Sequence, residues 1–182
     1  PADRVMEILR PEKIEKLGEG RYRVDFGEEI SGWVHLHDVT GEAGQRIDIR
    51  YLCESPNGSN SYTMRGGAPE SYHTRFTWYV FREVEIDGWP GELSPGQITA
   101  EAVYTDVSST GRFECSNPLF NRINRIWRRS QTDNMHGCIA SDCPHRERSA
   151  YTGDGQVACV TVMHNFDAAA SVSYTHLTLP TT

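Results

Sequence analysis

The stretch from residue 141 to 155, which reads SDCPHRERSAYTGDG, carries the most varied reactive chemistry in the chain. Carboxylates, guanidiniums, a thiol, an imidazole and a phenol lie within a few residues of one another. Neighbouring groups of this kind shift one another's pKa values toward those that proton transfer requires, so such a mixture is typical of a functional site. We therefore take residues 141–155, hereafter the reactive loop, as the candidate site.

Proline and glycine are expected to hold the reactive loop at its two ends. Pro144 fixes its own φ and biases Cys143 away from the helical region, so Asp142 and Cys143 should be extended or in a turn. Gly153 can adopt a positive φ, and Asp154 directly after it is well placed to cap the helix that follows. The sequence thus predicts a loop that is fixed before and after its charged centre.

The charged centre of the loop favours carboxyl groups of two kinds, one with a lowered pKa and one with a raised pKa. Arg146 or Arg148 should lower the pKa of a neighbouring carboxylate, whereas a carboxyl that donates a proton needs a raised pKa. If Glu147 is partly buried against Tyr151 while the two aspartates of the loop face the arginines, the pKa values separate. An acid beside an ionised carboxylate is the arrangement used in glycoside hydrolysis.

The loop also resembles a known motif. It is similar to the DCP-x-R-x-E-R-x-G-W-T-G-D type signature of bacterial α-L-rhamnosidases, glycoside hydrolase family 78. FECSNPLFNRINRIWRRS resembles the first barrel helix of these enzymes, and DFGEEISGW and FREVEIDGW are similar to segments of their β-sandwich. The resemblance implies an inverting hydrolase that removes terminal α-L-rhamnose from glycosides or polysaccharides. We predict no cofactor.

The resemblance also implies a role for each matching residue. Glu147 falls at the position of the general acid. Asp142, Arg146 and Asp154 fall where the family holds the sugar hydroxyls, and Tyr151 falls where many relatives carry a tryptophan against the sugar. Two departures accompany the match: many relatives have one more residue between the arginine and the glutamate, and the family's general base comes from far downstream. We therefore expect the chain to be inactive alone.

Two other hypotheses remain open for the loop, a zinc site and a structural ion-pair network. His136, Cys138, Cys143 and His145 form an H-x-C, C-x-H cluster, and thiolates with imidazoles suit tetrahedral zinc, although the usual C-x₂-C spacing is absent. Alternatively, DCPHRER is an ion-pair network that joins a helix to a sheet, because structural networks also shift pKa values.

A third alternative is a non-catalytic carbohydrate-binding sandwich, with sugar stacked on Trp33, Trp78 or Trp89. We expect these tryptophans to pack in the core or between domains instead, because aromatic side chains dominate buried contacts. His35 and His37 alternate onto one strand face and could hold a metal, but the sequence offers no third ligand beside them. We therefore predict no metal site.

Composition restricts the partners. The chain has 18 Lys and Arg against 25 Asp and Glu, a formal net charge of −7, which disfavours nucleic acid and anionic membrane surfaces. No apolar run approaches the length of a membrane span. A neutral sugar is compatible with this charge. The five cysteines lack the dense regular spacing of a disulfide scaffold.

Hydrophobic periodicity predicts an antiparallel β-sandwich followed by helices. Apolar residues alternate in 21–26, 32–39 and 46–52, as in half-buried strands. Residues 74–87, with two aromatic-rich runs, and residues 98–107 and 111–115 are also expected to be strands, while 54–72 reads as a long loop. At Asn117, a good N-cap before Pro118, the spacing becomes helical. A second helix is predicted over 155–170.

These elements divide the chain into three parts. Residues 1–110 are expected to form the β-sandwich domain. Residues 111–171 are expected to form the N-terminal part of a helical-barrel catalytic domain, a truncated (α/α)6 barrel of which one αα-hairpin is present. Residues 172–182 look like a translated sequencing adapter, and we expect native sequence to stop near Ala170 or Ser171.

Overall fold

The computed structural model describes residues 2–53, 58–137, 139–146, 148, 151–170 and 173. It divides into two compact units: Val5–Val103, hereafter the sandwich unit, and Pro1–Arg4 with Tyr104–Thr182, hereafter the helical unit. Almost all of the expected adapter-like tail lies outside the described residues. In the described part of the chain, the helices are too short or too polar to cross a membrane.

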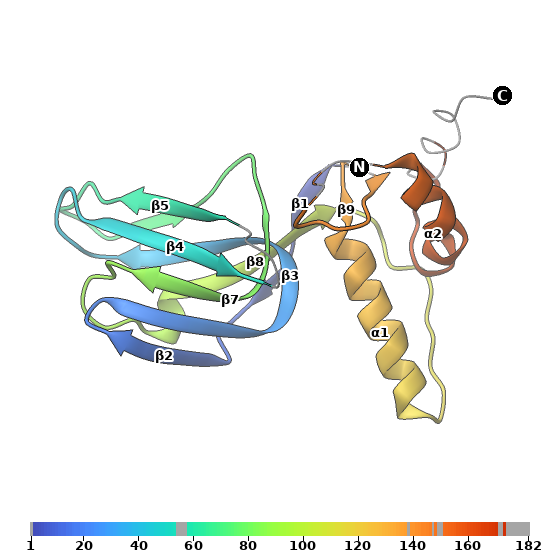
Figure 1. Ribbon diagram of the computed structural model, residues 1–182, viewed down its shortest axis with the longest axis horizontal. Coiled ribbons are helices and arrows are strands. Elements are labelled where there is room, and N and C mark those ends of the chain that lie inside the picture. Colours follow the sequence, from blue (N-terminus) through green and yellow to red (C-terminus); the bar gives the residue numbers. More distant parts are fainter. Residues whose placement is uncertain are drawn as a thin grey trace. The chain divides into compact units, whose positions relative to one another are not determined.

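Eight strands form one continuous antiparallel sheet (Figure 1). They are β1 (Asp3–Leu9), β2 (Lys13–Gly18), β3 (Arg21–Val39), β4 (Arg46–Leu52), β5 (Ser59–Thr63), β6 (Glu70–His73), β7 (Tyr79–Asp87) and β8 (Ile98–Thr105), with a short 3-10 helix at Pro95–Gln97. Their order is β1-β8-β3-β7-β4-β5, and β2 and β6 also pair with β3. The predicted β-sandwich is confirmed, but the prediction of a loop over 54–72 is wrong, because β5 and β6 lie within it.

The long strand β3 connects the two parts of the sheet. Its first half pairs with β2, its second half pairs with β8 and β6, and β7 pairs with parts of both halves. Between the halves the register with β7 shifts from Asp25 to Ile30, around Gly27 at a φ of 81°. Such an irregularity bends a strand, and the ribbon of β3 curves strongly in Figure 1. One strand therefore serves both parts of the sheet.

The sandwich core follows the alternation read from the sequence. On β3 the even-numbered positions Tyr22, Val24, Val34 and Leu36 are buried, whereas Arg23 and His35 between them face outward. The other strands supply buried partners in the same way: Ile47, Ile49, Tyr51, Phe81, Val84, Ile86, Ile98 and Ala100. Because the inward positions fill the core, the outward positions are available for polar chemistry.

The outward side of the second half of β3 carries an aromatic and imidazole cluster. Trp33 Nε1 donates to Glu101 Oε2 at 2.6 Å, and His35 Nδ1 lies 2.6 Å from Glu101 Oε1. The ring of His73 on β6 stacks on Trp33 with centroids 5.4 Å apart. His37 lies beside His35, with ring centroids 4.0 Å apart, and its Nε2 lies 2.8 Å from the Thr99 hydroxyl. Burial and the neighbouring His35 lower the pKa of His37.

In the helical unit, α1 (Pro118–Asp133) begins as predicted. The Asn117 side chain accepts the N–H of Leu119 at 3.0 Å, and Pro118 occupies the first turn. The predicted strand at 111–115 is wrong: Thr110 and Gly111 donate to the Asn165 carbonyl, and no strand of the described residues pairs with 111–115. The connection between the two helices contains a small hairpin, β9 (Met135–His136) and β10 (Ile139–Ala140), before α2 (Thr152–Asn165).

The helices have a small core of their own. Val107, Met135, Val162, Phe166 and Ala168 are buried together, with Trp127 packed against them. Most of the apolar stripe of α1 does not take part: Leu119, Phe120, Ile123 and Ile126 are each more than half exposed. In the structure this stripe remains in contact with solvent.

A single carboxylate connects the N-terminus of the chain to the β9–β10 turn. Asp3 Oδ1 accepts from the Thr105 hydroxyl and from the Gly137 N–H, each at 2.9 Å, and His136 Nδ1 lies 3.7 Å from Oδ2. Burial alone would raise the pKa of Asp3, but the contacts with His136, Gly137 and Thr105 outweigh it, and the net pKa is lowered.

This geometry predicts an acid-sensitive contribution from Asp3. A carboxyl with a lowered folded-state pKa stabilises the protein above its unfolded-state pKa of about 3.9, and that stability is lost as the pH falls through the folded-state pKa. In Asp3→Asn, the fall in unfolding temperature between about pH 6 and pH 3 should be smaller than in the parent. Asp106→Asn, which removes the half-buried partner of Arg4 in the same unit, is the control. Equal acid sensitivity in Asp3→Asn and the parent would contradict the assignment.

The sandwich unit should respond to pH in a different range. A histidine with a lowered folded-state pKa contributes its full stability above the unfolded-state value of about 6.5, and that contribution falls as acid protonates the unfolded chain. Replacing His37 by Gln, which can still bond to Thr99, should reduce the loss of stability between about pH 7.5 and pH 5, measured by urea unfolding. His164→Gln, at an exposed position of α2, should leave that loss unchanged. If His37→Gln loses as much stability as the parent over this pH range, the prediction is wrong.

Candidate active site

The reactive loop begins at a fixed point. After α1 ends, the β9–β10 hairpin turns at Gly137, which has a φ of 62°. Ser141 then donates its N–H to the Asn134 carbonyl at 2.9 Å and its hydroxyl to Asn134 Oδ1 at 3.1 Å. Asn134 is the C-cap of α1, so the loop leaves directly from the end of that helix.

The far end of the loop returns to the same hairpin. Tyr151 donates its N–H to the Ala140 carbonyl at 3.4 Å, and Gly155 donates to the Tyr151 carbonyl at 3.2 Å to close the first turn of α2. The chain between Ala140 and Tyr151 is therefore a closed loop with both ends on β10. The prediction of a loop pinned at its two ends is confirmed, although the contacts are made by residues other than those proposed.

Two details of the predicted helix start are wrong. Gly153 has no positive φ, because it lies inside α2, which begins at Thr152. Asp154 is not the cap: Tyr151 occupies that position and makes no side-chain capping bond, and Asp154 lies half-buried in the first turn. A carboxylate in this turn is stabilised by the unpaired N–H groups and the positive end of the helix dipole.

The centre of the loop contains a tight turn. Arg146 donates its N–H to the Cys143 carbonyl at 3.2 Å, and Pro144 between them is buried. Asp142 and Arg146 on either side of the turn are exposed, and the Cys143 thiol lies 3.6 Å from Asp142 Oδ2. The buried proline thus fixes the turn while the charged side chains on both sides meet solvent.

Glu147, the predicted general acid, lies outside the described residues, as do Ser149 and Ala150. The residue after it, Arg148, has a φ of 49°. A left-handed backbone is uncommon for a residue with a long side chain, and such conformations concentrate at functional sites. The structure therefore places an unusual backbone conformation directly beside the predicted acid.

The four predicted sugar-binding residues all belong to this loop or to the first turn of α2. Asp142 and Arg146 are exposed, Tyr151 is 47% exposed, and Asp154 is half-buried. Within the described residues, no ion pair or hydrogen bond joins the aspartates to Arg146. The hydrogen-bonding groups of Asp142, Arg146 and Asp154 are therefore not occupied by contacts among these three residues.

The sequence also left open two alternative sites, a zinc site in the reactive loop and tryptophans that stack on sugar. In the zinc hypothesis, Cys138 lies outside the described residues, and among the residues that are described no three His, Cys, Asp or Glu side chains are arranged to hold a metal ion. Of the tryptophans, Trp89 is 3% exposed and belongs to the core, whereas Trp33 is half-buried against Glu101 and His73. Sequence reasoning missed both partners of Trp33, because they come from β8 and β6, and only the strand register brings them beside it.

Two family models match the chain in sequence order. The bacterial alpha-L-rhamnosidase concanavalin-like domain matches residues 53–104, and the bacterial alpha-L-rhamnosidase 6 hairpin glycosidase domain matches residues 108–179. An alpha-L-rhamnosidase of Formosa agariphila is 32% identical over 185 residues, covering 92% of this chain and 19% of the relative. One from Streptomyces avermitilis is 29% identical over 180 residues, covering 91% of this chain and 17% of the relative.

Solved structures give the same match. The alpha-L-rhamnosidase from Dictyoglumus thermophilum has a TM-score of 0.88 at 32% identity, covering 97% of this chain and 21% of that one. The Streptomyces avermitilis enzyme complexed with L-rhamnose has a TM-score of 0.85 at 28% identity, covering 94% of this chain and 18% of that one. The chain spans roughly a fifth of the length of these relatives. Since both domain models and the relatives agree, the chain belongs to the bacterial α-L-rhamnosidase family.

Proposed function

We propose that a longer protein carrying this chain is an inverting glycoside hydrolase that releases terminal α-L-rhamnose from glycosides or polysaccharides. The observation that carries the proposal is the reactive loop itself, closed on β10 at both ends and matched by a rhamnosidase domain model. One similar structure is described as a complex with L-rhamnose, which supports rhamnose as the sugar.

In this proposal Glu147 protonates the departing glycosidic oxygen. A general acid must be neutral near the working pH, so its environment should be less polar than that of the flanking aspartates. The buried Pro144 and the left-handed Arg148 support this role, because both restrict the backbone on either side of the acid.

The neighbouring residues would hold the sugar. Asp142 and Asp154 can accept hydrogen bonds from ring hydroxyls, and Arg146 can donate to them. The half-exposed ring of Tyr151 offers an apolar surface for one face of the sugar. Asp154 lies in the first turn of α2, at the end of the reactive loop.

The general-acid role can be tested in the longer protein with Glu147→Gln. Loss of general acid catalysis should lower kcat by about 10²–10⁴-fold with an ordinary alkyl or aryl α-L-rhamnoside. The loss should be much smaller with a dinitrophenyl rhamnoside, because that leaving group departs without protonation. The measurement is release of the leaving group by parent and variant across this series of substrates.

Glu114→Gln is a matched control, since Glu114 is an exposed carboxylate paired with Arg112 in the same unit. Its turnover should equal that of the parent. Proton NMR of the first product should show β-L-rhamnose if the mechanism inverts. Unchanged turnover in Glu147→Gln would remove Glu147 from the acid role, and initial release of the α anomer would exclude inversion.

We also propose that the 182-residue chain does not hydrolyse rhamnosides by itself. Inversion needs a second carboxyl about 6.5–9.5 Å from the acid, with a water molecule between them. The family resemblance puts that base beyond the residues matched here, and the nearby Asp154 is assigned to sugar binding. The purified chain, shown to be folded by circular dichroism, should release no aryl group at concentrations where the longer protein turns over. Hydrolysis that disappears in Glu147→Gln of the short chain would overturn this proposal.

A further inference from the structure

A polar groove of about 420 Å³ lies on the outward side of the sandwich unit, across strands β3, β4, β5 and β7. Cavities of several hundred Å³ are large enough to hold a small ligand. The groove belongs entirely to the sandwich unit, whereas the reactive loop belongs to the helical unit. It is therefore a separate candidate site.

The charges that line this groove are balanced. Its basic side chains are Arg21, Arg46 and Arg50, and its acidic side chains are Asp48, Glu85 and Asp87. Each arginine has an acidic partner: Arg46 Nε donates to Asp48 at 2.8 Å, Arg21 lies 3.7 Å from Asp87, and Arg50 pairs closely with Glu85. Any side chain of the groove that could attract a charged ligand is already paired with a side chain of opposite charge. The groove therefore favours a neutral ligand.

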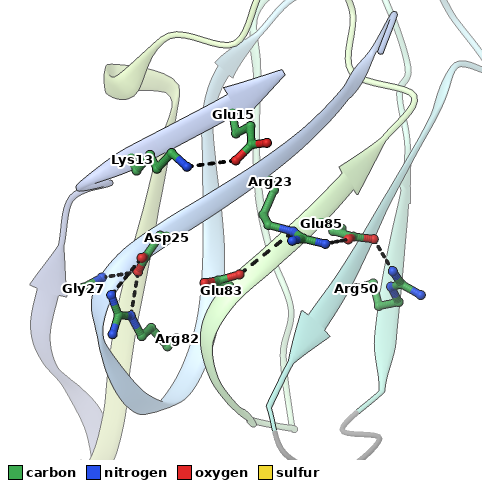
Figure 2. Close-up of polar contacts among 9 residues, drawn as sticks. All are labelled: Lys13, Glu15, Arg23, Asp25, Gly27, Arg50, Arg82, Glu83 and Glu85. Carbon is green, nitrogen blue, oxygen red and sulfur yellow. Dashed lines mark hydrogen bonds and ion pairs between the residues drawn. The ribbon is translucent and has the colours of Figure 1, made fainter. Parts of the chain in front are cut away.

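These side chains are also held in place. Arg46 Nη2 donates to the Ser61 hydroxyl at 2.8 Å, and Ser61 in turn bonds to Asp48. Figure 2 shows Glu85 between two guanidiniums, Arg50 on β4 and Arg23 on β3. Arg23 Nη2 donates to Glu85 Oε1 at 2.5 Å. Side chains that are ordered before binding reduce the entropy lost when a ligand is bound.

The bonded groups keep further hydrogen-bonding capacity. A guanidinium has five N–H donors and a carboxylate has about four acceptor positions, so one or two contacts do not exhaust either. The pKa of Asp48 is lowered, chiefly by the hydrogen bond from Ser61. Burial raises this pKa, but Arg46 lowers it again. The hydrogen bond from Arg23 lowers the pKa of Glu85. Both carboxyls therefore remain ionised acceptors at neutral pH. Leu17, 39% exposed, adds an apolar side chain at the groove.

We propose that this groove binds a neutral saccharide, with Arg46, Asp48 and Arg50 bonded to its hydroxyl groups. A hydroxyl both donates and accepts, so a polyhydroxylated ring can use donors and acceptors that lie side by side, and the apolar C–H groups of the ring suit Leu17. The site is non-catalytic. It goes beyond the proposed hydrolase function and does not depend on it.

The experiment is a titration of the 182-residue chain with methyl α-L-rhamnopyranoside, a neutral disaccharide and glucuronic acid, followed by saturation-transfer NMR and calorimetry. We expect the neutral sugars to bind and glucuronic acid to bind more weakly. Asp48→Asn and Arg50→Met should each weaken binding about tenfold, as expected for a lost hydrogen bond to a charged group. Ser59→Leu, which fills the groove from the exposed strand β5 without removing an ion pair, should also weaken it.

Lys13→Met is the matched control. Lys13 pairs with Glu15 at 2.9 Å on the same sheet (Figure 2). It lines a separate groove of about 150 Å³ and does not line the larger one. Its variant should bind like the parent, and the unfolding temperature of each variant shows whether it is folded. The proposal is overturned if none of the sugars binds, if glucuronic acid binds best, or if Ser59→Leu and Arg50→Met bind as the parent does. A Trp33→Phe variant that alone abolishes binding would instead place the sugar at the imidazole cluster. Glu147→Gln should not change the binding, which separates this result from the hydrolase proposal.

Discussion

The sandwich unit depends on the close approach of β3 and β8. Gly32 on β3 pairs with Ala102, and a Cβ atom at Gly32 would collide with the carbonyl oxygen of Glu101. Only glycine allows the two strands to pair at this point, so the register that follows is fixed by one missing side chain. That register brings Glu101 beside Trp33 and Thr99 beside His35. Through β3 it is also continuous with the pairing of β2, β6 and β7.

Much of this fold could be read from the sequence because its signals are local. The alternation of 21–26, 32–39 and 46–52, and the Asn117-Pro118 start of α1, agree with the structure since each depends on neighbours along the chain, although the first two segments form the single strand β3. The errors arise where contacts between distant parts of the chain decide whether a segment forms a strand. The segment 111–115 has an alternating pattern, but within the described residues no strand lies beside it to complete a ladder. Residues 59–63 are polar, yet they form a strand because β4 offers them a full edge.

The same distinction applies to the two sites. The reactive loop is contiguous, so its residue types alone made it a candidate site. The prediction misplaced the start of α2, because Gly153 is helical. The charged groove could not be found in this way. Arg23, Glu85 and Arg50 are far apart in the sequence and become neighbours only because three strands pair in register. Each strand alone reads as an ordinary half-solvated face, and the balance of charge emerges from the sheet.

The exposed stripe of α1 has a consequence for how the sequence is maintained by selection. Leu119, Phe120, Ile123 and Ile126 gain little from burial inside these residues, so a polar substitution there would cost this chain little stability. Random substitution would replace such positions quickly if stability within the chain were the only constraint. A comparison of substitution rates between this stripe and the buried Met135 or Val162 would therefore measure how strongly contacts outside the chain have constrained its first helix.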